Sequence, residues 1–160
     1  MGQQQLLLVI LVTIIVGIAT VVAINTFGTA ADQANIDAVT TDVATLASAA
    51  QGYFMRPAML GGGSRDFDGL TFDGLAFPAS GIDEDQLIAR NENGVYMISG
   101  ASGDEFTITA YPSSCEGFVG GSVDDDGLLT GATGGCAEGD RITAEVGPNN
   151  FELVATPDDV

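Results

Sequence analysis

The chain begins with an uncharged apolar run that a small globular domain cannot bury. Leu6–Ile24 reads LLLVILVTIIVGIATVVAI, 19 residues without a charge. As a helix it would be roughly 28 Å long, enough to cross the hydrocarbon core of a bilayer. A cleaved secretory signal has a basic start and a small-residue cleavage site, and neither is present around this run, which only Met1–Gln5 precedes. The run therefore predicts a single-pass membrane anchor or a tightly packed helix bundle.

The helical pattern continues beyond the apolar run. From Ile36 to Phe54, apolar residues recur at spacings of three and four and predict one apolar stripe along a helix. Three acidic residues fall off this stripe: Asp32, Asp37 and Asp42. An amphipathic second half of this kind predicts packing against another layer of the same chain.

Two positions bear on where this helix weakens and ends. Gly28 is expected to soften or kink it, because glycine costs about 1 kcal/mol in a helix interior. Arg56-Pro57 is the expected stop, since the residue before a proline disfavours the helical conformation. The sequence thus predicts one helix of about 50 residues, roughly 75–80 Å long. Its first half must be buried in lipid or among copies of itself.

The charge balance excludes several function classes. The chain has 4 basic and 22 acidic residues, a net charge of −18, and no His, Lys or Trp. It cannot follow a phosphate backbone or dock on anionic lipid through a basic patch. It also lacks the commonest general base and the Schiff-base amine, so we expect it not to be an enzyme. Asp104 and Asp140 remain the candidate carboxylates for an enzyme hypothesis.

All four basic residues are arginine: Arg56, Arg65, Arg90 and Arg141. An acidic surface without lysine is typical of a halophilic protein, because concentrated salt screens self-repulsion. The alternative is an acidic surface retained for solubility.

A short polar start, an uncharged apolar helix and an amphipathic continuation before a β-rich remainder resemble the type IV pilin and pseudopilin superfamily. Gly2-Gln3 followed by LLLVIL is similar to a prepilin-peptidase site, where cleavage follows the glycine and the new N-terminus is methylated. No basic leader precedes Gly2, so Met1 is the alternative mature N-terminus. Gln5 stands where the family usually has a glutamate. The resemblance covers residues 1–55 by motif and the remainder only by architecture.

The resemblance implies a structural subunit that polymerises with copies of itself into an extracellular filament. Such a subunit stands in the membrane first and is extracted by an inner-membrane assembly machinery. Residues 1–27 would form the membrane and polymerisation part. Its expected contact residues are Gln5, Leu6, Leu8, Ile10, Ile14, Ile18 and Val22. The alternatives are a type II secretion pseudopilin and a membrane-anchored, single-pass ligand-binding domain.

Residues 56–93 form a turn-rich connection with a small internal repeat. Phe67–Leu70 reads FDGL, and Phe72–Leu75 repeats the same four letters. Asp-Gly favours turns, and a phenylalanine every five residues can anchor successive turns on a core. We expect local packing combined with a role in subunit contacts, because so long a connection is usually functional or disordered.

Two hairpins are predicted in the last third of the chain. Residues 94–99 and 105–111 show strand patterns around a Gly-rich turn, and residues 141–146 and 151–155 flank Gly147-Pro148-Asn149-Asn150. Together they predict a four-stranded antiparallel sheet whose apolar face covers the helix stripe. The predicted fold class is therefore α+β, with an N-terminal helix over residues 1–55 and a β domain over residues 56–160.

Between the hairpins, Cys115 and Cys136 bound a Gly-rich region without strong periodicity. No CxxC pattern occurs, so zinc, thioredoxin-like and covalent haem sites have no support. In an exported chain the two cysteines would form a disulfide that stabilises the fold by about 3 kcal/mol. The resemblance implies that this region is exposed, variable surface.

Asp124-Asp125-Asp126-Gly127 is the single metal-like signal in the sequence. Asp124 and Asp126 fit the spacing of calcium ligands in an EF-hand loop. However, Ser122 occupies the position of the first aspartate and Thr133 that of the bidentate glutamate. A solvated acidic turn is the preferred interpretation, calcium is the alternative, and no other cofactor is predicted.

Overall fold

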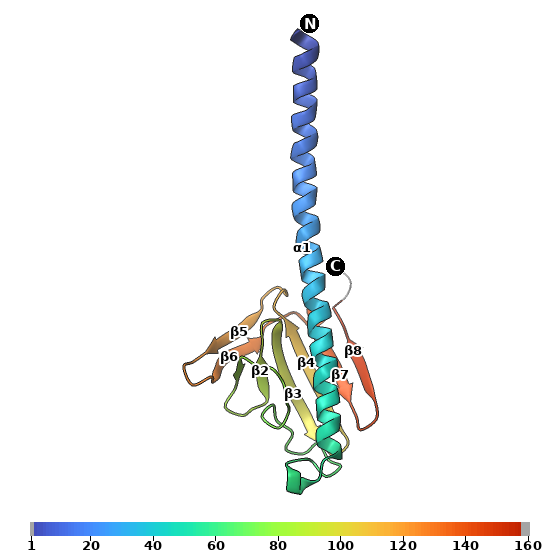
Figure 1. Ribbon diagram of the computed structural model, residues 1–160, viewed down its shortest axis with the longest axis vertical. Coiled ribbons are helices and arrows are strands. Elements are labelled where there is room, and N and C mark those ends of the chain that lie inside the picture. Colours follow the sequence, from blue (N-terminus) through green and yellow to red (C-terminus); the bar gives the residue numbers. More distant parts are fainter. Residues whose placement is uncertain (1, 158–160) are drawn as a thin grey trace. The chain divides into compact units, whose positions relative to one another are not determined.

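The computed structural model describes residues 2–157 and has an α+β fold, as predicted (Figure 1). Helix α1 (Gly2–Met55) is followed by antiparallel strands. The chain divides into two compact units, Met1–Ala34 and Asn35–Val160. The second half of α1 belongs to the same unit as the strands, which we call the β unit.

Helix α1 ends where the sequence predicts. Its last residue is Met55, directly before Arg56-Pro57. The helix is continuous through Gly28, so the softening expected there produces no break. A short 3₁₀ helix, η1 (Ala58–Leu60), follows the proline. The chemistry of the residue before proline thus fixes the end of the helix.

The main sheet has six strands in the order β1-β2-β3-β4-β7-β8, and every pair is antiparallel. Its strands are β1 (Gly81–Ile82), β2 (Ile88–Arg90), β3 (Gly94–Ser102), β4 (Glu105–Pro112), β7 (Ile142–Val146) and β8 (Phe151–Ala155). Both predicted hairpins, β3–β4 and β7–β8, are confirmed. The predicted count of four strands was wrong, because β1 and β2 are too short to show a period. The Asp83 carboxylate stabilises the turn between β1 and β2 by accepting hydrogen bonds from the N–H groups of Leu87 and Ile88, at 2.9 and 2.8 Å.

The region between the two cysteines is more regular than its sequence indicates. It forms a separate two-stranded sheet, β5 (Val119–Val123) and β6 (Leu129–Gly134). Glycines at 121 and 131 adopt positive φ angles of 67° and 72°. Because glycine has no side chain, these strands carry little of the alternating hydropathy that marks a strand. A second short 3₁₀ helix, η2 (Glu138–Asp140), leads into β7.

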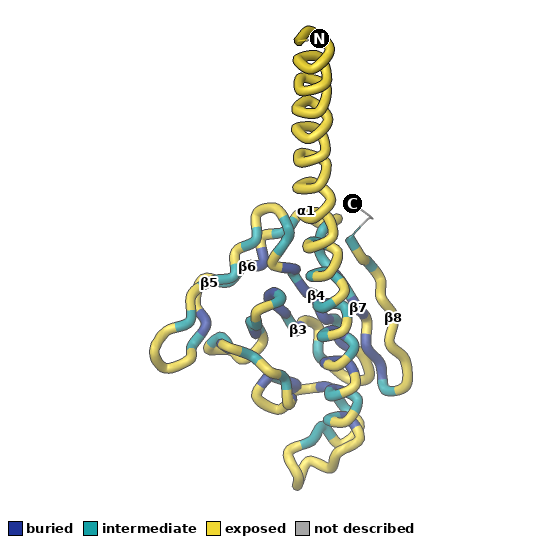
Figure 2. Tube along the Cα trace, turned by 45° about the horizontal axis from the view of Figure 1, so that its top comes forward, coloured by how far each residue is buried: buried dark blue, intermediate teal, exposed yellow. Residues whose placement is uncertain are grey.

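The core lies between the second half of α1 and one face of the six-stranded sheet (Figure 2). The predicted stripe is confirmed, and its buried residues are Val39, Val43, Leu46, Ala47, Ala50 and Phe54. Opposite it, alternate sheet residues are buried: Tyr96, Ile98, Phe106, Ile108, Ala110, Ile142, Ala144 and Val146. Burying a large apolar side chain contributes about 1.5–3 kcal/mol, so this interface is the main stabilising element of the β unit.

The internal repeat supplies a third part of the core. Its four apolar members, Phe67, Leu70, Phe72 and Leu75, are all buried. The ring of Phe67 lies 4.9 Å from that of Phe54 and 4.8 Å from that of Phe106, centroid to centroid. The packing role of the repeat is therefore confirmed. The Asp-Gly turns bring both phenylalanines back to the same core.

Candidate functional site

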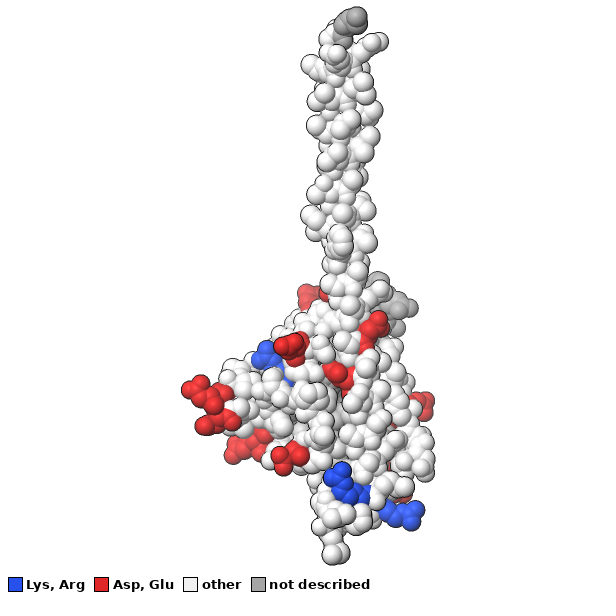
Figure 3. Space-filling view, in the orientation of Figure 1, with Lys and Arg blue, Asp and Glu red and all other residues white. Residues whose placement is uncertain are grey.

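The apolar segment of α1 exposes its large side chains. From Leu6 to Ile24, every Leu, Ile and Val has 50–69% of its surface exposed, and Phe27 is more exposed still. α1 is the one helix in the described chain that is long and apolar enough to cross a membrane. This segment carries no charged group (Figure 3). Exposed apolar surface on this scale marks a membrane or protein contact.

The polar groups within this segment are satisfied by the helix itself. The hydroxyls of Thr13 and Thr20 donate to the carbonyls of Ile10 and Val16, both at 2.8 Å. Farther along, Thr26 donates to a carbonyl of the preceding turn at 2.9 Å. A hydroxyl bonded in this way costs little when water is removed. The segment can therefore enter an apolar environment without leaving a hydroxyl unpaired.

The predicted contact residues share one line on the helix, with two exceptions. Leu6, Ile10, Ile14, Ile18 and Val22 follow each other at spacings of four, while Gln5 and Leu8 lie off that row. Apolar side chains also occupy the remaining faces of the segment. A helix that is apolar all round needs lipid or several neighbours around it, rather than one partner.

The predicted processing site lies at the start of the described helix. Gly2 and Gln3 are helical residues, and Met1, the alternative mature N-terminus, lies outside the described residues. Cleavage and methylation therefore stay predictions.

The predicted disulfide between Cys115 and Cys136 is confirmed. It joins the two ends of the β5–β6 hairpin, with their Cα atoms 5.6 Å apart. The hairpin is also held by Arg90, whose guanidinium donates to the carbonyl oxygen of Gly121 at 2.9 Å. Gly134 lies so close to the ring of Tyr111 that no Cβ would fit there. The region is thus a covalently closed hairpin fixed to the main sheet.

The calcium candidate is a hairpin turn. Asp124 and Asp126 lie between β5 and β6, where Oδ1 of Asp124 accepts the N–H groups of Asp126 at 3.1 Å and Leu128 at 2.8 Å. Its carboxylate thereby shapes the turn. Among the described residues, no three His, Cys, Asp or Glu side chains are grouped so that they could hold a metal.

The candidate carboxylates of the enzyme hypothesis do not converge. Asp104 precedes β4 and Asp140 precedes β7. In the antiparallel β4–β7 pair, Phe106 lies opposite Val146 and Ala110 opposite Ile142. The two carboxylates therefore lie at opposite ends of this strand pair and cannot act on one substrate atom.

Sequence reasoning missed a polar anchor on α1. Asp42 was placed off the packing stripe, yet its Oδ2 accepts hydrogen bonds from the amides of Asn91 and Asn93, both at 2.8 Å, and from the hydroxyl of Tyr96 at 2.7 Å. One helix face also carries Asn35, two turns earlier, whose amide donates to the carbonyl of Asn93 at 2.9 Å. Burial, with the Asp42 carboxylate beside it, raises the pKa of Tyr96 above its ordinary value. The spacing of seven residues places Asn35 and Asp42 on the same face of the helix, and this was the signal in the sequence that could have revealed the anchor.

An open groove of about 440 Å³ lies beside this anchor. Its walls include Asp42, Ser80 and Glu92. The groove is the place in the β unit where the ligand-binding alternative would be tested first.

Comparisons of the chain with protein family models, with curated proteins and with solved structures found no match.

Proposed function

We propose that the chain is a structural subunit that assembles with copies of itself through the apolar segment of α1. The observation that carries the proposal is the exposure of Leu6–Ile24, a segment that is apolar on every side and has no charge. In a membrane, lipid covers this surface before assembly. In a filament, neighbouring copies of the same helix cover it instead. The resemblance of residues 1–55 to type IV pilins favours a filament outside the cell, built by an inner-membrane machinery.

Packing must drive the transfer from lipid into a helix bundle, because lipid already satisfies the apolar side chains. The row of Leu6, Ile10, Ile14, Ile18 and Val22 offers branched side chains that can interdigitate between copies. At the start of the row, Gln5 can accept a hydrogen bond from the terminal amine of a neighbour. This bond is weaker than one to the glutamate usual in the family.

Two alternatives use the same helix. A secretion pseudopilin would form short filaments only, and a single-pass anchor would hold the β unit at a membrane as a ligand-binding module. The anchor needs the length and hydropathy of Leu6–Ile24 but not the shape of its side chains. This difference separates anchoring from assembly.

The first experiment is electron microscopy of material sheared from cells that express the full chain, with mass spectrometry of its N-terminus. Thin filaments of this chain with a methylated Met1 or Gln3 would support the proposal. Extraction only as a membrane-bound monomer with an unmodified terminus would overturn it. In that case Leu6–Ile24 is a permanent anchor.

A variant pair separates assembly from anchoring. Ile14→Ala/Ile18→Ala keeps the segment apolar but removes branched side chains from the row, so we expect membrane insertion to persist and filaments to become scarce. Thr45→Ala, at an exposed position on the second half of α1, is the matched control and should leave filaments intact. Unchanged filaments in the double variant would contradict packing through this row.

A further inference from the structure

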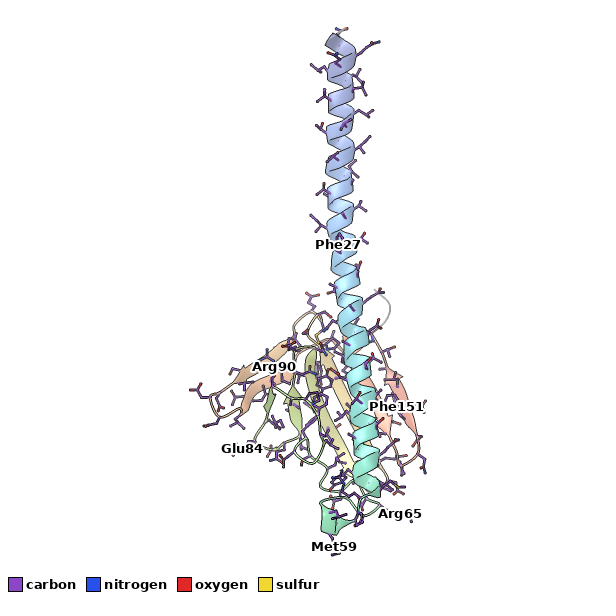
Figure 4. All side chains as sticks on the ribbon, in the orientation of Figure 1. Phe27, Met59, Arg65, Glu84, Arg90 and Phe151 are labelled. Atoms are coloured by element: carbon purple, nitrogen blue, oxygen red, sulfur yellow. A yellow bond between two sulfur atoms is a disulfide. The ribbon has the colours of Figure 1, made fainter. Side chains whose placement is uncertain are left out.

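Outside the apolar segment, the exposed large apolar side chains of the described β unit fall into two groups, apart from the isolated Leu87 and Val119. The first group, Met55, Met59 and Leu60, lies where α1 ends, and together with the exposed Arg56 and Arg65 we call it the tip patch. The second, Phe151, Leu153 and Val154, lies on the edge strand β8, and together with Glu145 and Glu152 of the same hairpin we call it the edge patch. Figure 4 labels Met59 and Arg65 in the first patch and Phe151 in the second, well apart on the β unit.

The tip patch is a built structure rather than a loose loop. The last carbonyls of α1 accept N–H groups from the loop that follows: Tyr53 from Gly63 at 3.0 Å and Phe54 from Arg65 at 2.8 Å. Ser64 and Arg65 both adopt positive φ angles, 54° and 74°. Two successive non-glycine residues in this region are costly, and such strain tends to persist at functional positions. The loop thus holds an unfavourable conformation at Ser64 and Arg65, and the Arg65 side chain is exposed to solvent.

The tip patch is also cationic in a strongly acidic protein. Two of the four arginines are engaged elsewhere, Arg90 with the carbonyl of Gly121 and Arg141 with Glu138 at 3.0 Å. Within residues 2–157, the exposed guanidiniums of Arg56 and Arg65 make no hydrogen bond or ion pair. Blue groups accordingly gather at the end of the β unit where the tip patch lies (Figure 3). Met59, 97% exposed, adds a flexible apolar side chain at the same end of the β unit.

The edge patch has the complementary chemistry. β8 is the outer strand of the six-stranded sheet and pairs only with β7. Phe151 and Leu153 pair with the buried Val146 and Ala144, so they lie at the rim of the sheet face that packs on α1, where they are 38% and 36% exposed. Glu145 lies directly opposite Glu152 in the β7–β8 register. Like charges in that position destabilise a strand pair, so a cation placed there is favourable.

We propose that the tip patch of one copy docks on the edge patch of a second copy of this chain. The tip patch straddles the free edge of β8. Its apolar side chains contact Phe151 and Leu153 on one face of the sheet, and its two guanidiniums reach the carboxylates of Glu145 and Glu152 on the other face. This contact would be a second surface, besides the apolar segment, through which copies assemble. It rests on the proposed function only in that copies of the chain must meet.

The charges decide the symmetry of this contact. Tip against tip would bring four arginines together, and edge against edge would bring four glutamates together. Both symmetric pairings are disfavoured by repulsion, whereas tip against edge is attractive. A contact between two different patches of the same chain is heterologous and adds copies head to tail, in an open series unless the rotation closes a ring. Each contact can be weak, because repetition along an assembly raises its effective strength.

Cysteine cross-linking of the full chain tests the contact. The sequence has two cysteines, and both are in the disulfide, so introduced thiols react alone. We expect Met59→Cys/Val154→Cys to give a ladder of dimers, trimers and longer products on mild oxidation. A mixture of the two single variants should give dimers, and each single variant alone should stay monomeric. Pairing Met59→Cys with Glu84→Cys, an exposed acidic turn position labelled in Figure 4, is the matched control and should give little product.

A charge exchange gives the second measurement. Arg56→Glu/Arg65→Glu in the Met59→Cys copy should lower the dimer yield about tenfold at low salt. Glu145→Arg/Glu152→Arg in the Val154→Cys copy should restore it. The intact native disulfide and the circular dichroism spectrum confirm that each variant is folded.

The outcomes separate this contact from the proposed function. Dimers from either single variant alone, equal yield with Glu84→Cys, or no rescue by the exchanged charges would overturn the contact. Filaments without any ladder would overturn it and leave assembly through the apolar segment standing. A ladder from detergent-solubilised chain that forms no filaments would support the contact and count against the filament. Absence of both would overturn the two proposals together.

Discussion

The hydroxyl of Tyr96 donates a 2.7 Å hydrogen bond to Oδ2 of Asp42 and thereby joins the centre of the sheet to α1. Tyr96 is completely buried, and the same carboxylate oxygen also accepts the amides of Asn91 and Asn93. One aspartate on the helix therefore satisfies three donors of the β2–β3 segment.

Removal of this acceptor should destabilise the β unit. In Asp42→Ala, the Tyr96 hydroxyl keeps its buried position and loses its partner, so we expect the free energy of unfolding to fall by about 2–3 kcal/mol. Urea denaturation of the full chain in detergent measures the change. Asp37→Ala, at an exposed helix position, is the control and should change it by less than about 0.5 kcal/mol. Equal effects of the two substitutions would contradict the anchoring role.

Alkaline pH should weaken the fold through Tyr96. Burial first, and Asp42 second, raise the folded-state pKa of this phenol above its ordinary value of 10.0. The folded state then retains a proton that the unfolded chain loses, so the stabilisation is complete below pH 10 and is lost as the pH rises above it. The slope should approach about 1.4 kcal/mol per pH unit.

Denaturation between pH 8 and 11 checks this slope. Lysine cannot contribute, because all four basic residues are arginine. Tyr96→Phe should have a lower free energy of unfolding at pH 8, and this free energy should fall less steeply above pH 10. In Tyr53→Phe the free energy of unfolding should fall as steeply as in the unmodified chain. A steep decline that survives in Tyr96→Phe would exclude this phenol as its cause.

Opening the disulfide should loosen the β5–β6 hairpin selectively. The bond between Cys115 and Cys136 closes a loop of 21 residues, for which chain entropy gives about 3 kcal/mol. In Cys115→Ser/Cys136→Ser we expect faster amide exchange in β5 and β6 and little change in α1 and β4. Hydrogen exchange with mass spectrometry resolves these segments. Equal loss of protection in all of them would show that the disulfide stabilises the whole unit.

The internal repeat should behave as core. Phe72 is buried, with its ring 5.6 Å from that of Phe77, so Phe72→Ala should cost about 3–5 kcal/mol. Met59→Ala, at an almost fully exposed site, should cost less than about 0.5 kcal/mol. Thermal melts of both variants measure the difference, and a mild effect of Phe72→Ala would show that the connection packs loosely.

Salt should stabilise the acidic surface. The net charge is −18, and one ion pair, Arg141–Glu138, is present among the described residues. Screening of the unpaired carboxylates should raise Tm, by on the order of 5 °C between 0.1 and 2 M KCl. A Tm independent of KCl would favour the solubility interpretation over the halophilic one.

The predictable parts of the fold were those encoded locally. The end of α1 followed from Arg56-Pro57, and the β3–β4 and β7–β8 hairpins followed from alternating residues around Gly-rich turns. β1 and β2 were missed because two or three residues cannot display a period. β5 and β6 were missed because glycine carries no hydropathy signal.

The candidate sites divide in the same way. The apolar segment was visible in the sequence, since 19 uncharged residues need no tertiary context to be noticed. Asp42 was misplaced because periodicity sorts residues by hydropathy alone, and it cannot show that a buried tyrosine hydroxyl will need an acceptor. The tip and edge patches also escaped prediction, because exposure of Met59 or Phe151 depends on how the rest of the chain folds.

The closed β5–β6 hairpin has a consequence for engineering. Its two ends are fixed 5.6 Å apart by a covalent bond, and its strands form their own sheet. A foreign peptide inserted between Asp124 and Gly127 would therefore meet a preformed frame, provided Gly127 is kept, because its carbonyl accepts the N–H of Ile82 in β1 at 3.4 Å. If copies assemble as proposed, such grafts would be displayed on each of them, and this turn would serve as an insertion point for an epitope or a binding peptide.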